Sequence, residues 1–106
     1  MNKIPYKTRR EVYIQAVTRH GLPEQMIVAI EELSEVQKEI CKVMRGKGSM
    51  EHLAEEIADA TIMLEQLRLL YGLNDKVCEQ MDAKLVRLAT DLGIRLEEES
   101  VEGGKN

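Results

Sequence analysis

Glycine and proline divide this chain into segments of helix length. Every glycine and proline except Pro23 lies between or outside four long segments, and Pro23 begins the second of them. Proline is tolerated in the first turn of a helix and glycine favours the position just after its end, so these residues mark helix boundaries. The sequence predicts four helices, at Tyr6–His20, Pro23–Arg45, Met50–Tyr71 and Asn74–Asp91.

The connections between these segments are short, which favours antiparallel packing of consecutive helices. Three tyrosines are the only aromatic residues, so an extensive sheet is disfavoured. A chain of 106 residues fits one domain. We therefore expect an all-α fold of antiparallel helix hairpins resembling a four-helix bundle, forming one domain over 1–106, with a core at about 6–92 and a frayed tail at 97–106.

Composition argues against several functional classes. The net charge of -4 and the scarcity of aromatic rings disfavour a nucleic-acid partner, because phosphate contacts need clustered basic residues. No apolar run approaches the roughly 18 residues of a membrane span, and no signal-like stretch follows the basic start, so we expect a cytoplasmic protein without a membrane partner. Cys41 and Cys78 form no metal-binding or redox motif, and we expect both to be reduced packing residues.

A carboxylate interrupts the apolar face of the third helix. At about 100° per residue, Glu56 falls within that face and Asp59 lies at its edge one turn later. Glutamates on a solvated face would instead project away from the apolar side chains. The apolar face consists of Leu53, Ile57, Ala60, Met63, Leu64, Leu67 and Leu70.

The second helix repeats this arrangement. Glu32 and Glu35 flank its apolar face three residues apart, a spacing that directs both side chains to one side of the helix. In an antiparallel hairpin this pair can face Glu56 and Asp59. The apolar face of the second helix consists of Met26, Ile30, Leu33, Ile40 and Met44.

Four converging carboxylates repel one another and require neutralisation. Protonation can supply it, but oxygen ligands without histidine or thiolate favour Mg²⁺ or Mn²⁺ over zinc or copper. A di-iron site would need Glu-x-x-His pairs, which His20 and His52 are not placed to form. The alternative is a set of solvated glutamates or salt bridges to Lys38 and Lys42, which explains Glu56 poorly.

The order and spacing of these acids resemble a known family. Glu31-Glu32-Leu33-Ser34-Glu35, followed after 20 intervening residues by Glu56-Ile57-Ala58-Asp59, resembles the EExxE…ExxD signature of the MazG-like all-α nucleotide pyrophosphohydrolases. The resemblance covers roughly Gln25 to Leu88.

The resemblance implies a helical homodimer or tetramer that binds Mg²⁺, with Mn²⁺ as a substitute. It implies cleavage of the α–β phosphoanhydride of an NTP or dNTP, giving a monophosphate and pyrophosphate. Self-association also agrees with apolar faces on the second and third helices that are too wide for one chain to cover. The implied metal ligands are Glu32, Glu35, Glu56 and Asp59.

Further roles are expected for five residues. Glu35 is the preferred carboxylate for activating the attacking water. Lys84 and Arg87, three residues apart on one flank of the fourth helix, can hold the phosphates, with Lys84 stabilising charge during catalysis; the alternative is that both are solvated. Gln25 can contact the nucleotide. Glu31 points about 100° away from Glu32, which favours a supporting role over direct ligation.

Two non-enzymatic functions remain open at the sequence level. The chain can be a helical interaction module that keeps the bundle without catalysis. It can also be a metal-dependent protein that binds a nucleotide without cleaving it. The presence of all four implied ligands counts against the interaction module, and the nucleotide-binding alternative stays open.

Overall fold

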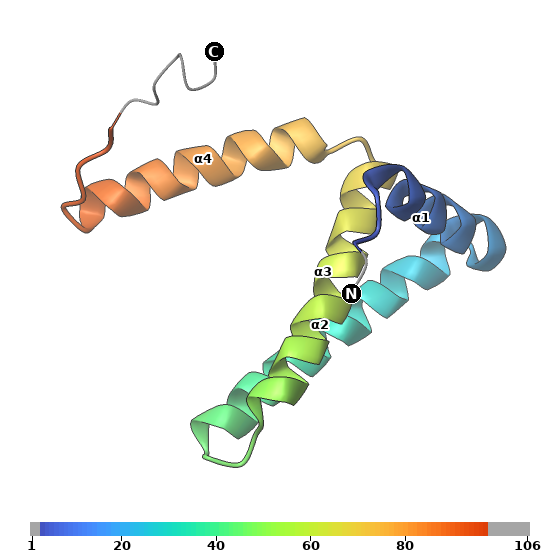
Figure 1. Ribbon diagram of the computed structural model, residues 1–106, viewed down its shortest axis with the longest axis horizontal. Helices are drawn as coiled ribbons and strands as arrows, with labels where there is room; N and C mark the ends of the chain where they lie inside the picture. The colour runs from blue at the N-terminus through green and yellow to red at the C-terminus, as the bar shows by residue number, and fades with distance from the viewer. Residues whose placement is uncertain (1–2, 98–106) are drawn as a thin grey trace. The chain divides into compact units, whose positions relative to one another are not determined.

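The computed structural model describes residues 3–97, and this part of the chain is all-α (Figure 1). It contains α1 (Tyr6–His20), α2 (Leu22–Met44), α3 (Met50–Leu70) and α4 (Asn74–Asp91). The predicted fold class is confirmed, and no strand occurs between residues 3 and 97. None of the helices in this range is both long and apolar enough to cross a membrane.

The chain divides into two compact units, the first ending at Leu73 and the second beginning at Asn74. The first unit contains α1, α2 and α3, and the second contains α4. The single domain expected over 1–106 stays a prediction. The expectation of a frayed tail falls mostly on 98–106, which lie outside the described residues.

Local sequence explains the turn between α2 and α3. Gly46 has φ 73°, in the left-handed region that glycine adopts without strain. It allows the amide of Lys47 to donate back to the carbonyl of Lys42 at 2.9 Å, a bond that closes the end of α2. Ser49 then caps α3, because its hydroxyl accepts a hydrogen bond from the amide of His52 at 3.0 Å.

Helices α2 and α3 lie side by side as an antiparallel hairpin (Figure 1). Two contacts define its register. Gln25 is hydrogen-bonded to Gln66 near the open end, and the carboxylate of Glu32 lies near that of Asp59 further along. Seven residues separate the members on each helix, so the two helices advance together by two turns between these contacts.

The side of α2 that packs against α3 differs from its most apolar side. Gln25, Ala29 and Glu39 are buried there. Each residue of the predicted apolar face directly follows a buried or half-buried residue and is therefore rotated about 100° out of the seam. The exposed residues are Met26, Ile30, Leu33, Ile40 and Met44. Small Ala29 and the hydrogen-bonded amide of Gln25 permit close packing where larger apolar side chains were expected.

The predicted face of α3 is only partly the packing face. Ala60 and Met63 are buried, whereas Ile57 and Leu64 are exposed. Three further members are half-buried, namely Leu53, Leu67 and Leu70. The buried strip on α3 is therefore narrower than the wheel predicts.

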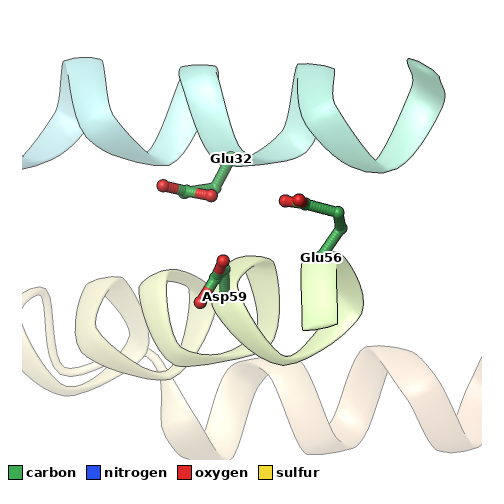
Figure 2. A group of neighbouring side chains, drawn as sticks. All are labelled: Glu32, Glu56 and Asp59. Carbon is green, nitrogen blue, oxygen red and sulfur yellow. The ribbon is translucent and has the colours of Figure 1, made fainter. Parts of the chain in front are cut away.

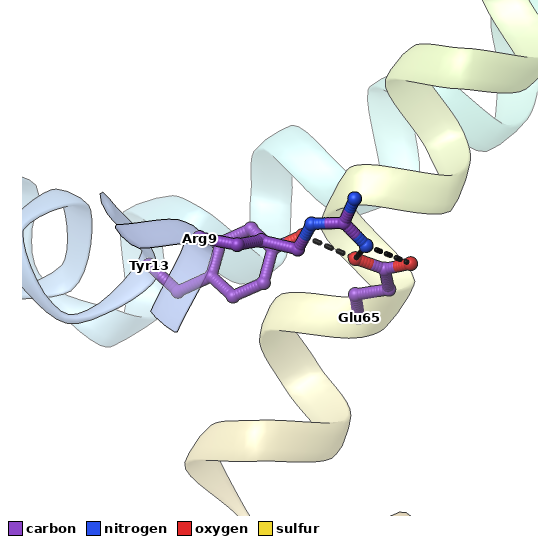
Figure 3. Close-up of polar contacts among 3 residues, drawn as sticks. All are labelled: Arg9, Tyr13 and Glu65. Atoms are coloured by element: carbon purple, nitrogen blue, oxygen red, sulfur yellow. Dashed lines mark hydrogen bonds and ion pairs between the residues drawn. The ribbon is translucent and has the colours of Figure 1, made fainter. Parts of the chain in front are cut away.

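Helix α1 is attached to the hairpin by a polar contact with α3 (Figure 3). The hydroxyl of buried Tyr13 donates a hydrogen bond to the carboxylate of Glu65. Arg9 forms an ion pair with the same carboxylate at 3.3 Å. Burial, and then the neighbouring Glu65, raise the pKa of Tyr13 to about 12. The phenol therefore remains a hydrogen-bond donor throughout the neutral range.

Candidate functional site

Three carboxylates from two helices meet in the α2–α3 seam (Figure 2). Glu32 projects from α2 toward α3, and Glu56 and Asp59 project from consecutive turns of α3 toward α2. One oxygen from each side chain lies within 4.8 Å of the other two. The i, i+3 spacing on α3 and the antiparallel register of the hairpin together produce this convergence.

The seam disfavours charge on two of these groups. Glu32 and Glu56 are half-buried. Desolvation by burial is the main cause that raises the pKa of each carboxyl, and the negative charge of Asp59 is the next. Loss of hydration and mutual repulsion thus act in the same direction.

Glu35 and Glu31 lie beside this group of three. Both side chains are exposed, and neither belongs to the set of mutually close oxygens. The charge of Glu35 nevertheless contributes to the raised pKa of both Glu32 and Glu56. Glu31 contributes to that of Glu32. The structure thus brings together three of the four predicted ligands and places Glu35 at their margin.

Glu39 is a buried acid that the sequence analysis did not single out. It is 5% exposed, and its Oε2 lies 3.4 Å from Nζ of Lys42. Its charge also contributes to the raised pKa of Glu56. Glu39 follows Glu32 by seven residues, the spacing that keeps two side chains on one helix face, and this spacing was the available signal.

Gln25 lies inside the hairpin. Nε2 of Gln66 donates a hydrogen bond to Oε1 of Gln25 at 2.8 Å, and both residues are buried. The polar end of Gln25 is therefore occupied by a partner on α3. Its predicted contact with a nucleotide would require this amide pair to open.

Lys84 and Arg87 lie on α4, in the second compact unit. Both side chains are exposed. Their three-residue spacing places them on neighbouring turns of one flank of α4. Their predicted contact with phosphates stays a prediction.

The site consists of oxygen donors. Among the described residues, no histidine or cysteine joins Glu32, Glu56 and Asp59 in this group. Such a set suits a hard divalent cation, and it also suits shared protons, because either neutralises the repulsion. No protein-family model, curated protein or solved structure matches the chain.

Proposed function

We propose that this protein is a Mg²⁺-dependent nucleoside triphosphate pyrophosphohydrolase of the MazG-like type. The substrate is an NTP or dNTP, and the products are a nucleoside monophosphate and pyrophosphate. The active form is a homodimer or tetramer. The observation that carries the proposal is the convergence of Glu32, Glu56 and Asp59, whose oxygens lie within 4.8 Å of one another, at the positions of the acidic signature.

The donor set fits the proposed cation. Three carboxylates offer hard oxygen ligands, and Mg²⁺ and Mn²⁺ prefer such ligands. The raised pKa values of Glu32 and Glu56 support the same idea, since these groups are poorly neutralised in the protein alone. A bound divalent cation would neutralise phosphate oxygens and lower the pKa of a bound water.

The residues of the chain would divide the remaining tasks. Glu32, Glu56 and Asp59 would hold the cation, which would neutralise charge on the phosphate under attack. Glu35, exposed at the margin of the group, accepts a proton from the attacking water. The water oxygen bonds to the α-phosphorus, the bond from that phosphorus to the bridging oxygen breaks, and pyrophosphate leaves. Lys84 and Arg87 are proposed contacts to the phosphates, and Glu31 supports Glu32.

Product analysis of the purified full chain tests this proposal. With Mg²⁺ and a panel of NTPs and dNTPs, we expect at least one nucleotide to give its monophosphate and pyrophosphate in equal amounts. Glu56→Gln should lower turnover by roughly 10²-fold or more, the scale for losing one electrostatic contact at a reacting centre. The matched control is Glu55→Gln, which removes an exposed carboxylate from the preceding position and should retain activity.

Other results would support a different function. Nucleotide that binds with Mg²⁺ but stays intact would favour the non-catalytic nucleotide-binding protein. A chain that neither binds nor cleaves any nucleotide would favour the helical interaction module.

A further inference from the structure

A lysine side chain on α2, that of Lys42, lies beyond the acidic residues of the same helix, toward the turn. Nζ of Lys42 is 3.4 Å from the carboxylate of Glu39, which is 5% exposed. The lysine side chain itself is 39% exposed. The buried acid therefore anchors an ammonium group that solvent, and a ligand, can still reach.

The position of this pair relates it to the candidate site. Glu35, Glu39 and Lys42 follow one another at i, i+4 and i+7, so they lie along one side of α2. Lys42 follows Glu32, the member of the group of three on α2, by ten residues, which corresponds to a rise of about 15 Å along the helix. Long helical side chains lean toward the N-terminus of their helix, which directs Lys42 back toward Glu35 and the group of three acids. A polyphosphate chain and the lysine stem can together span this separation.

The excess of negative charge at the site favours a role for the ammonium group of Lys42. The charges of Glu35 and Glu39 add to the negative charge around the three converging carboxylates, since both raise the pKa of Glu56. A triphosphate brings further negative charge to the same place. A metal ion held by the three converging acids would neutralise part of the phosphate chain. Phosphates that extend from there along α2 toward Glu39 would need a second positive neighbour.

We propose that Lys42 binds the β- and γ-phosphates of the nucleotide while Glu39 holds its ammonium group in place. This inference rests on the proposed function and adds to it a residue that the acidic signature does not include. Lys42 is a substrate-binding residue in this scheme, and Glu39 is a positioning residue. The pair recognises the length of the phosphate chain, so it distinguishes a triphosphate from a monophosphate and is indifferent to the base.

The test compares Lys42→Met with wild type and with Lys38→Met. Methionine keeps most of the apolar stem of lysine and removes its charge. Lys38 is exposed one turn earlier on α2, so its variant reproduces the change in net charge. At saturating Mg²⁺ we expect Lys42→Met to raise the KM for the nucleoside triphosphate tenfold or more. Lys38→Met should leave KM within about twofold, and Lys42→Arg should restore most of the affinity.

Titration with Mn²⁺ alone separates phosphate binding from damage to the acidic site. Lys42→Met removes a positive charge near the carboxylates, so affinity for Mn²⁺ should be unchanged or higher. Inhibition by the nucleoside monophosphate should also be unchanged, since it lacks the outer phosphates. If Lys42→Met is poorly folded, the double variant Glu39→Gln, Lys42→Met removes the unpaired buried carboxylate and should show the same rise in KM.

The outcomes distinguish the two proposals. An active wild type with an unchanged KM in Lys42→Met would overturn the inference and leave the proposed function intact. Equal losses of Mn²⁺ and nucleotide affinity would also overturn it, because Lys42 would then serve the acidic site as a whole. A wild type that neither binds nor cleaves nucleotides would overturn the proposed function and, with it, this role of Lys42.

Discussion

Glu56 illustrates how one residue can tie stability to pH. Its carboxyl lies on the packing side of α3, with Asp59 one turn away and Glu35 and Glu39 contributed by α2. Burial and these charges raise its pKa above the usual 4.5. The folded protein therefore holds the proton more tightly than the unfolded chain does.

The sign of the resulting pH dependence is determined by this difference. Below pH 4.5 the carboxyl is protonated in both states, and its contribution to stability is fully present. As the pH rises through the folded-state pKa, this contribution is lost. Glu56 and Glu32 should therefore give the metal-free protein a higher thermal midpoint near pH 5 than near pH 7. Glu56→Gln should reduce this difference, measured by circular dichroism across the pH range.

Addition of Mg²⁺ provides the complementary measurement. A cation that binds the folded carboxylates stabilises the protein by mass action and should raise the midpoint most at neutral pH, where these groups are ionised. The control is the Glu56→Gln protein, in which the Mg²⁺ effect should shrink. The account of the acidic site would be wrong if the midpoint of wild type were the same at pH 5 and pH 7 without Mg²⁺, and if Mg²⁺ changed neither value.

At the level of elements, the α2–α3 hairpin contains a buried hydrogen-bonded pair near its open end. The side chains of Gln25 and Gln66 satisfy one another inside the seam. Removing one partner leaves the other amide buried without its bond, at a cost of about 1–3 kcal/mol. We expect Gln25→Leu to lower the free energy of unfolding by this amount, measured by urea denaturation.

The double variant Gln25→Leu, Gln66→Leu is the matched control. It replaces both amides by apolar groups and should recover most of the loss, because no unsatisfied group remains. Additive destabilisation by the two substitutions would show that the pair is not coupled. If Gln25 also contacts the nucleotide, the double variant would be stable and yet show a raised KM.

The sequence predicted the elements better than their contacts. Helix ends follow from local chemistry, such as the Ser49 cap and the conformation of Gly46, and these agree with the structure. The rotational setting of α2 depends on what α3 presents to it, which a helical wheel does not contain. The burial of Glu39 and the hydrogen bond between Gln25 and Gln66 were therefore not predicted, because both depend on the partner helix.

At the scale of the whole molecule, the apolar face of α2, which consists of Met26, Ile30, Leu33, Ile40 and Met44, is not covered by α3. Its members are exposed, and Ile30 is 67% exposed. Exposed apolar side chains aligned on one helix favour association with another surface. We expect a homodimer or tetramer at micromolar concentration, measured by sedimentation, as against a monomer of 12.1 kDa.

Substitution in this face tests the surface that mediates this association. Ile30→Lys should shift the protein toward the monomer while leaving its helical content unchanged, since the side chain is already exposed. Val12→Lys, at a similarly exposed apolar residue on α1, is the control and should leave the assembly intact. A wild type that sediments as a monomer throughout the micromolar range would refute the prediction.

The constant register of the α2–α3 hairpin also determines which changes in chain length the site can tolerate. One residue inserted into α2 after Glu32 would rotate the rest of α2, up to the turn, by about 100° relative to Glu32. One residue inserted into α3 before Glu56 would rotate the preceding part of α3 by the same angle relative to Glu56 and Asp59. An extra residue in the turn at 45–49 rotates neither helix. Additions of seven residues to both helices at once would preserve both faces. Length variation compatible with the acidic group should therefore be concentrated in the turn, or occur in matched pairs of heptads.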